Sequence, residues 1–230
     1  MAKKKIGIIG ATGYTGSELV RILTNHPDIE ITMITSESRA GELFSDVHPF
    51  LQGIADQKLV SINQIDEYEL DLVFLALPHG ISMDFVKRFK DKPFKIIDLS
   101  GDFRLSSKEV YEEWYKLNHI FPEGIEKAVF GSPELYFDKI KDANLIANPG
   151  CFPTTAILGL APLLKGNLIE EDSIIVDSKT GVTGAGIKAK TVNLYSNVND
   201  NFKAYGLKNH RHTIEMQGIL DEVSGKETRI

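Results

Sequence analysis

The stretch NPGCFPTT, residues 148–155, contains the single cysteine of the chain, Cys151. The apolar run AILGLAPLL follows Pro153, and proline is favoured in a first helical turn, so Cys151 is expected at or just before a helix N-terminus. At that position the helix dipole and the free backbone N–H groups stabilise a thiolate. Structural cysteines usually lie within apolar sequence, whereas this one lies at a Pro- and Gly-rich turn. The pattern therefore predicts a nucleophilic cysteine.

A glycine motif, GATGYTG at residues 10–16, follows an apolar run and precedes a helical pattern. Its GxxGxxG spacing differs from the commoner GxGxxG but meets the same demands: a tight turn, close approach to a pyrophosphate, and N–H groups aimed at an anion. A merely structural turn is the alternative. We expect a dinucleotide site with contacts from Gly10, Thr12, Gly13, Tyr14, Thr15 and Gly16.

The residues after the second predicted strand distinguish between the two nicotinamide dinucleotides. NAD enzymes usually present an acidic residue to the ribose 2′-hydroxyl, whereas TSESRAG offers Ser36, Ser38 and Arg39, which suit a 2′-phosphate. Glu37 is the exception in this stretch, because an acid here is typical of NAD enzymes. We interpret it as a loop acid that points away from the cofactor. The stretch therefore favours NADP.

A cysteine beside a nicotinamide indicates a particular chemistry. A carboxyl group accepts hydride poorly, whereas a thioester carbonyl accepts it better. The thiolate must then capture an activated acyl group first, and an acyl phosphate supplies the leaving group. The sequence thus predicts an acyl-phosphate reductase.

The proposed chemistry needs an acid/base group to transfer a proton, and the chain has six histidines that are candidates for this role. We expect His26, His48 and His119 to be surface or turn residues. His79 follows a predicted strand at the edge of the sheet, where both cofactor contact and plain capping are open.

The segment NHRHT contains the other two, His210 and His212. If this segment is extended, both point to one side and Arg211 points to the other. Acid/base catalysis by a histidine works best when the pKa of its side chain is near neutrality.

The elements that must position these residues alternate along the chain. Helical patterns separate apolar runs, while the polar stretch 37–57 is expected to be an extended connection. This alternation predicts a doubly wound, Rossmann-like parallel sheet of the α/β class, with its ligand crevice at the carboxyl ends of the strands. The predicted strands are residues 5–9, 30–35, 71–78, 95–100 and 144–149.

Composition narrows the partners. The chain has 230 residues and a net charge of −6, and its lysines and arginines are scattered, which argues against nucleic acid. No apolar run approaches the roughly 20 residues that span a bilayer, so no membrane partner is expected. The N-terminus does not read as a signal peptide, and one cysteine cannot form an intramolecular disulfide, so a cytoplasmic location is expected. No metal site is expected.

Six motifs occur in an order that closely resembles the N-acetyl-γ-glutamyl-phosphate reductase family of arginine biosynthesis, in the aspartate-semialdehyde dehydrogenase superfamily. The resemblance covers essentially the whole chain, and NPGCFPT and NHRHT are its most specific parts. The motifs are GATGYTG, LALPHG, DLSGDFRL, NPGCFPT, SKTGVTGAG and NHRHT.

The resemblance implies roles for particular residues. It implies Cys151 as the nucleophile and a histidine of HRH as acid/base, for which we prefer His212. It implies NADPH at the glycine loop, with further contacts at Pro78, His79, Ser100 and Gly184. The substrate should carry a phosphate and a carboxylate, for which Arg104, Lys179, His210 and Arg211 are candidates, with Lys188 a weaker one; the alternative for each cation is a surface charge.

Two small departures and one large one qualify the resemblance. Thr180 replaces a usual serine, and Ile214 replaces the proline that commonly precedes Glu215. Family members usually continue well beyond this point, so we expect a nucleotide domain (1–148) followed by an α+β catalytic domain (149–230) that looks incomplete. Homo-oligomer formation is possible. The alternatives are a related reductase of lysine biosynthesis, an aspartate-semialdehyde dehydrogenase, and a non-catalytic NADP-binding fragment.

Overall fold

The computed structural model describes residues 2–230, and its centre is a six-stranded parallel sheet in the order β2-β1-β3-β4-β6-β5. The predicted parallel sheet is confirmed. The short strand β5 was not predicted, because two residues give no periodicity to detect. The strands are β1 (Lys4–Ile9), β2 (Ile29–Ile34), β3 (Leu72–Leu75), β4 (Lys95–Asp98), β5 (Val129–Phe130) and β6 (Leu145–Ala147).

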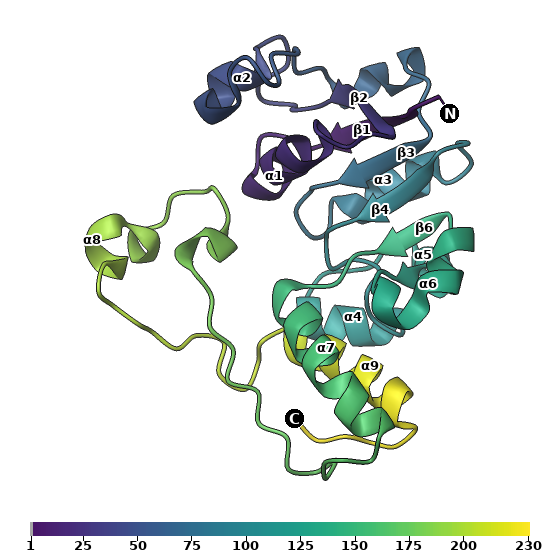
Figure 1. Ribbon diagram of the computed structural model, residues 1–230, viewed down its shortest axis with the longest axis vertical. Coiled ribbons are helices and arrows are strands. Elements are labelled where there is room, and N and C mark those ends of the chain that lie inside the picture. Colours follow the sequence, from purple (N-terminus) through teal and green to yellow (C-terminus); the bar gives the residue numbers. More distant parts are fainter. Residues whose placement is uncertain (1) are drawn as a thin grey trace.

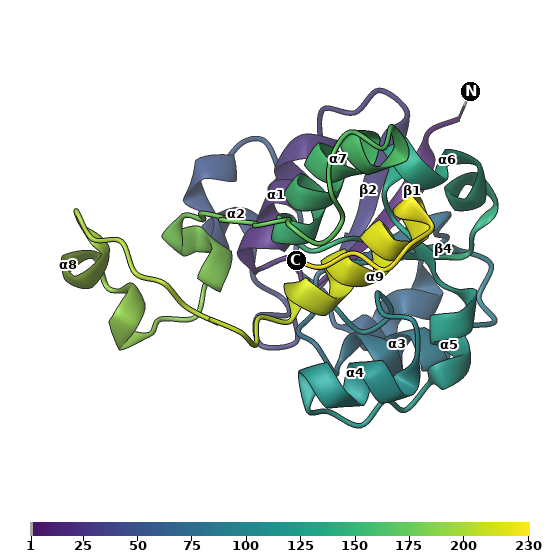
Figure 2. The same ribbon diagram turned by 90° about the horizontal axis from the view of Figure 1, so that it is seen from below.

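Helices cover both faces of this sheet (Figures 1 and 2). Helix α1 (Tyr14–Leu23) and helix α7 (Cys151–Lys165) lie on one side. The other side is covered by α3 (Ser82–Phe89), α4 (Lys108–Tyr115) and α5 (Pro122–Lys127). The remaining helix of this part is α6 (Pro133–Asp142). None of the helices within residues 2–230 is long and apolar enough to cross a membrane.

The apolar spacing of the helices explains how they attach. Met83, Phe85, Val86 and Phe89 of α3 are all buried, and they belong to the main core together with side chains of β3 and β4. Burial of each such side chain contributes about 1.5–3 kcal/mol. These contacts keep the carboxyl ends of the strands, where the predicted site residues lie, in fixed relative positions.

The connection 37–57 is not simply extended, which corrects the expectation. It contains α2 (Phe44–Val47) and a 3₁₀ turn, η1 (Pro49–Leu51). Phe44 and Leu51 are fully or almost fully buried and join the core beside β1. Apolar side chains spaced through a polar stretch therefore attach it to the core beside β1. A second 3₁₀ helix, η2 (Ile62–Glu67), precedes β3.

Beyond β6 the chain forms two packed helices and a long excursion between them. Helix α7 packs on α9 (His212–Ser224) through Ile157, Leu164 and Leu220. Residues 166–211, called the arm here, contain η3 (Val182–Ala185), η4 (Thr191–Asn193) and α8 (Tyr195–Val198). The arm projects from the rest of the chain in both views, and within the described residues none from 166 to 211 is buried. The α+β organisation expected after residue 149 is represented only by helices and irregular segments in the part of the chain that the structure describes.

Candidate functional site

The glycine loop lies between the carboxyl end of β1 and the start of α1, as predicted. Gly10 has a φ of +83°, and a Cβ there would lie 2.6 Å from the Ala76 carbonyl oxygen. A Cβ at Gly16 would lie 2.6 Å from Cα of Ala11, so this glycine permits close packing of the helix on the strand. A Cβ at Gly13 would meet no atom closer than the Gly10 carbonyl oxygen, at 3.9 Å, so space beside this glycine is open to a ligand. The N–H groups of Tyr14 and Thr15 open α1 and have no acceptor within the helix.

The residues expected to select NADP lie just after β2. Ser36 is buried and its hydroxyl lies 3.3 Å from that of Thr12, while Ser38 and Arg39 are exposed. The Arg39 guanidinium forms an exposed ion pair with Glu42 at 3.0 Å. The carboxylate of Glu37 accepts hydrogen bonds from the backbone N–H of Ile62 and the hydroxyl of Ser61, at 2.8 and 3.2 Å. The carboxylate of Glu37 is therefore bound to the residues that begin η2.

The loop after β3 contains Pro78, which is exposed, and His79, which is half-buried. Nδ1 of His79 accepts a hydrogen bond from the N–H of Gly101 at 2.8 Å, so the neutral ring carries its proton on Nε2. Burial, followed by the positive charges of Arg211 and Arg104, lowers the pKa of His79 to about 4. His79 is therefore a neutral donor at pH 7.

Ser100 lies inside the protein rather than at an open surface. Its hydroxyl donates to Asp98 at 2.7 Å and accepts the N–H of Asp102 at 3.1 Å. The carboxylate of Asp102 in turn accepts the N–H of Gly80 at 2.9 Å and the hydroxyl of Tyr111 at 2.8 Å. This buried network fixes the position of the loop after β3. The hydroxyl of Ser100 forms part of the network, so its role here is structural.

Cys151 is the first residue of α7 and its side chain is exposed, which confirms the predicted helix start. The residue follows the carboxyl end of β6, at the same edge of the sheet as the glycine loop, because all the strands are parallel. β6 is three positions from β1 in the sheet, so the two motifs are roughly 14 Å apart across it. The N–H groups of Cys151 and Phe152 have no acceptor within the helix and can stabilise an anion.

The HRH segment is not extended, and this corrects the strand geometry assumed for it. Arg211 has φ −57° and ψ −28°, and α9 begins at His212. His212 N–H donates to Nδ1 of His210 at 3.2 Å, and the two rings are 4.8 Å apart. The two rings are therefore close because the chain turns at Arg211 into α9, and not because the two side chains alternate along a strand.

His212 faces the cysteine helix. Its Nε2 lies directly over Cα of Gly150, where only a glycine fits, and its ring centre is 5.8 Å from that of Phe152. Burial, and then His210, Arg104, Arg211 and His79, lower the pKa of His212 to about 3, far from neutrality. Nδ1 of His212 is buried and finds no hydrogen-bond partner among residues 2–230.

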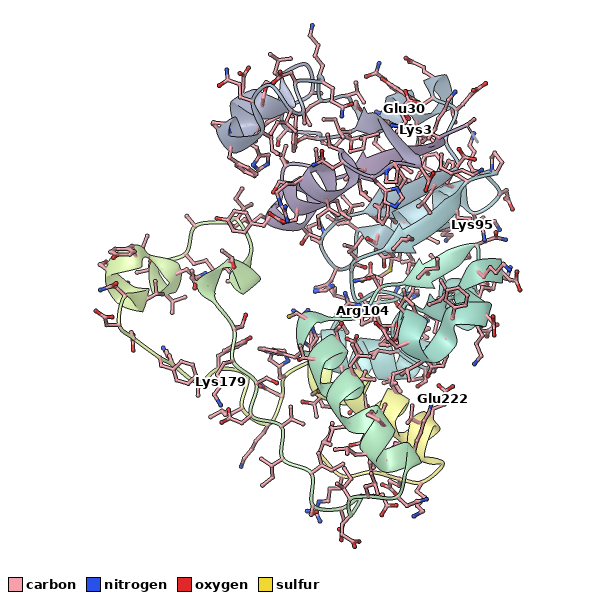
Figure 3. All side chains as sticks on the ribbon, in the orientation of Figure 1. Lys3, Glu30, Lys95, Arg104, Lys179 and Glu222 are labelled. Carbon is pink, nitrogen blue, oxygen red and sulfur yellow. The ribbon has the colours of Figure 1, made fainter. Side chains whose placement is uncertain are left out.

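A buried ion pair underlies this cluster (Figure 3 labels Arg104). The Arg104 side chain is 5% exposed and that of Glu215 is 0% exposed, and Nη1 lies 3.4 Å from Oε2. Arg104 also donates to the Leu99 carbonyl at 2.7 Å. Glu215 accepts the N–H of Gly150 at 2.8 Å, so it links α9 directly to the start of α7. Sequence reasoning assigned no role to Glu215, although its position one helical turn after His212 was an available signal.

Of the other predicted cations, Arg211 lies at this cluster, where its charge lowers the pKa of His212 and of His79, whereas the two lysines lie in the arm. Arg211 is exposed, with its guanidinium 4.8 Å from the centre of the Tyr115 ring. Lys179, Gly184 and Lys188 all lie exposed in the arm, where Lys179 pairs with Asp177. In Figure 3, Lys179 lies apart from Arg104. The arm approaches the site at its far end instead, where the Tyr205 ring is 5.4 Å from that of His210.

Two of the three histidines expected to be surface or turn residues lie in connections, as expected, but are buried rather than at the surface. His119 is 1% exposed, and its Nε2 bonds to the Asp102 carbonyl at 2.8 Å. His48 is 5% exposed, and its Nε2 lies 3.2 Å from the Thr12 carbonyl oxygen. Each ring thus forms a hydrogen bond with a backbone carbonyl, which offsets part of the cost of burying it. His26 is exposed, as expected.

The fold and the site define a Rossmann-type α/β protein with a cysteine and a histidine at the carboxyl edge of its sheet. Two family models match the chain: semialdehyde dehydrogenase, NAD binding domain, over residues 5–143, and semialdehyde dehydrogenase, dimerisation domain, over residues 151–230. The chain belongs to the semialdehyde dehydrogenase family.

Curated relatives carry a more specific name. Proteins named N-acetyl-gamma-glutamyl-phosphate reductase are 45% identical over 229 residues in Moorella thermoacetica and 50% identical over 223 residues in Methanocaldococcus jannaschii. The alignments cover 98% and 96% of this chain but 66% and 64% of those proteins. The chain therefore spans about two thirds of the length of these relatives.

Solved structures support the fold. Aspartate semialdehyde dehydrogenase II from Vibrio cholerae has a TM-score of 0.65 at 13% identity, with 99% of this chain and 68% of that chain covered. Aspartate semialdehyde dehydrogenase with NADP from Candida albicans has a TM-score of 0.54 at 19% identity, with 72% and 48% covered. At such identities the likeness concerns the fold.

Proposed function

We propose that this chain carries the nucleotide site and the nucleophile of an N-acetyl-γ-glutamyl-phosphate reductase, which converts the acyl phosphate to N-acetylglutamate semialdehyde. The observation that carries the proposal is the contact between two helix starts: Cys151 opens α7, and His212 opens α9 against Gly150. The names of the relatives, at 45 and 50% identity, agree with this reaction.

The cofactor of this proposal is NADP, which supplies a hydride when bound. The glycine loop would hold the pyrophosphate on the N–H groups that open α1, while Ser36, Ser38 and Arg39 would receive the 2′-phosphate. Engagement of Glu37 by Ser61 and Ile62 supports this choice, because it holds the acid in other contacts, while the exposed Arg39 would exchange its surface ion pair with Glu42 for the phosphate.

In the proposed mechanism Cys151 forms a bond from sulfur to the acyl carbon, and the bond from that carbon to the phosphate oxygen breaks. The N–H groups of Cys151 and Phe152 stabilise the oxyanion. The thioester carbon would accept the hydride that NADPH supplies when bound; collapse of the resulting oxyanion would break the carbon–sulfur bond and release the aldehyde, with Cys151 as the thiolate. His212 would accept the thiol proton before the attack and return it to the sulfur of Cys151 when the aldehyde leaves.

The low pKa of His212 fits the first of these tasks. A ring whose pKa is about 3 is neutral at pH 7 and can accept a proton. To act as an acid it must bind protons more strongly, and an anionic substrate beside it would raise its pKa by offsetting the charges of Arg104 and Arg211. Substrate binding and proton transfer are coupled in this proposal.

A second candidate, an NADP-binding unit without turnover, is favoured by one observation. Lys179 and Gly184 are both exposed in the arm, and Lys179 pairs with Asp177 rather than with a residue of the cysteine–histidine cluster. Homo-oligomer formation through residues 149–230 is part of the first proposal, and the description of the matching family model as a dimerisation domain agrees with it.

Phosphate-dependent reduction of NADP with N-acetylglutamate semialdehyde tests the first proposal. Aspartate semialdehyde and the carrier-linked aminoadipate semialdehyde serve as competing substrates. A preference for either would identify the related dehydrogenase or the lysine-biosynthesis reductase instead. Cys151→Ser is the matched control, since it should bind NADPH normally yet fail to turn over. Cofactor binding without turnover in the unmodified chain would favour the second candidate.

The cofactor assignment has its own test. Arg39→Ala should weaken NADPH by roughly 1.5–3 kcal/mol, the value of hydrogen bonds to a charged group, and leave NADH almost unchanged. Fluorescence titration of both cofactors measures this. Equal losses for both would remove the 2′-phosphate assignment.

A further inference from the structure

The Thr12 carbonyl, in the middle of the glycine loop, is held by a histidine 36 residues further along the chain. Nε2 of His48 lies 3.2 Å from this oxygen, and the His48 side chain is buried. A carbonyl oxygen can only accept, so His48 donates and its proton lies on Nε2.

The rest of the loop is tied to the end of β2. The N–H of Gly10 donates to the Thr35 hydroxyl at 3.2 Å, and the N–H of Ala11 donates to the Thr35 carbonyl at 3.0 Å. The hydroxyl of Thr12 meets that of Ser36 at 3.3 Å. These bonds hold the first half of the loop from one strand, and the bond from His48 holds the Thr12 carbonyl from a separate element.

His48 is itself firmly placed. It ends α2, where its N–H donates to the Phe44 carbonyl at 2.9 Å, and its ring lies 4.9 Å from that of fully buried Phe44 and 5.8 Å from that of Phe50. Burial is the largest influence on the pKa of His48 and lowers it; the hydrogen bond to the Thr12 carbonyl acts in the opposite direction, and the charge of Arg39 lowers the pKa further. Arg39 belongs to the same connection between β2 and α2.

We infer that His48 is a positioning residue for the pyrophosphate loop, acting through its hydrogen bond to the Thr12 carbonyl. It orients the peptide that leads into Gly13, and so directs the N–H groups at the start of α1 towards the ligand. This inference rests on the proposed function only for the identity of the ligand. It gives the connection 37–57 a role in loop geometry as well as in recognition of the 2′-phosphate.

Two substitutions separate the hydrogen bond from the space that the ring fills. His48→Gln keeps an N–H donor near the position of Nε2, whereas His48→Met has similar length and no donor. His26→Met, at an exposed histidine, is the matched control. Loss of the bond should raise the NADPH Kd of His48→Met about 3- to 10-fold. His48→Gln and His26→Met should bind like the unmodified chain. Adenosine 2′-monophosphate, which has no pyrophosphate, should bind all four proteins equally.

Hydrogen exchange without ligand gives a second readout. Amides 12–16 should exchange faster in His48→Met than in His48→Gln. The inference is overturned if the Met variant matches the unmodified chain in both measurements, if Gln fails as badly as Met, or if binding of adenosine 2′-monophosphate weakens as much as that of NADPH. If the unmodified chain binds no NADPH while exchange still separates Met from Gln, the positioning role stands and the proposed function fails.

Discussion

The carboxylate of Glu215 should stabilise the α7–α9 unit mainly as a hydrogen-bond acceptor and only slightly as a charge. Its side chain is 0% exposed and accepts the N–H of Gly150 at 2.8 Å, whereas its contact with Arg104 is longer, at 3.4 Å. Arg104 keeps a strong bond to the Leu99 carbonyl in any case. Burial is the largest influence on Glu215 and raises its pKa, so the folded protein disfavours the charged form despite Arg104.

The magnitudes follow from these contacts. Glu215→Ala leaves the buried N–H of Gly150 without its acceptor, which should cost about 1.5–3 kcal/mol. Glu215→Gln keeps an oxygen for Gly150 and avoids the cost of burying a charge. We expect a loss below about 1.5 kcal/mol for Gln.

Urea unfolding followed by circular dichroism measures both losses. Emission from Trp114, the single tryptophan, reports on the main core around β3 and β4 in the same experiment. The two variants should therefore differ more by circular dichroism than by Trp114 emission. If Gln is as destabilising as Ala, the charge rather than the hydrogen bond supports the unit, and the reasoning is wrong.

The pH dependence of Glu215 provides a second check. Because its folded pKa is raised, the stability that it contributes is full below its unfolded pKa of about 4.3 and falls as the pH rises through the folded pKa. Glu215→Gln lacks this loss. The stability of Gln relative to the unmodified chain should therefore improve between pH 4 and pH 7, and an opposite trend would contradict the burial argument.

Three further outcomes are expected. Leu220→Ala, at a fully buried position between α7 and α9, should cost about 2–5 kcal/mol in urea unfolding, and a loss below 1 kcal/mol would mean that the two helices are not packed as described. His212 and His79 have folded pKa values of about 3 and 4, below the ordinary 6.5, so the unfolded chain binds protons at a higher pH than the folded chain does. The stability that this contributes should be full above about pH 6.5 and fall towards pH 4, and the fall should be less steep in His212→Asn. Parallel stability curves for the two proteins would contradict this prediction. Iodoacetamide should alkylate exposed Cys151 without denaturant and at a rate that NADPH changes, and reaction only after unfolding would show a buried thiol.

The sequence alone determined the features that depend on neighbours along the chain. The alternation of apolar runs and helical patterns predicted the parallel sheet, because side-chain periodicity is a local property. The glycine loop was predicted for the same reason, since Gly10 and Gly16 stand where a turn and a close packing contact require them. Pro153 after Cys151 correctly indicated a helix start.

The tertiary structure decided which polar groups meet across long separations. Arg104 and Glu215 are 111 residues apart, and His48 and Thr12 are 36 apart, and neither pair has a spacing that a periodic pattern could reveal. His48 and His119 lie in polar sequence yet are buried, because carbonyl oxygens brought from other segments satisfy their rings. His210 and His212 are neighbours because the chain turns into α9 at His212. The position of α9 depends on the packing of Leu220 against α7, which is a tertiary contact.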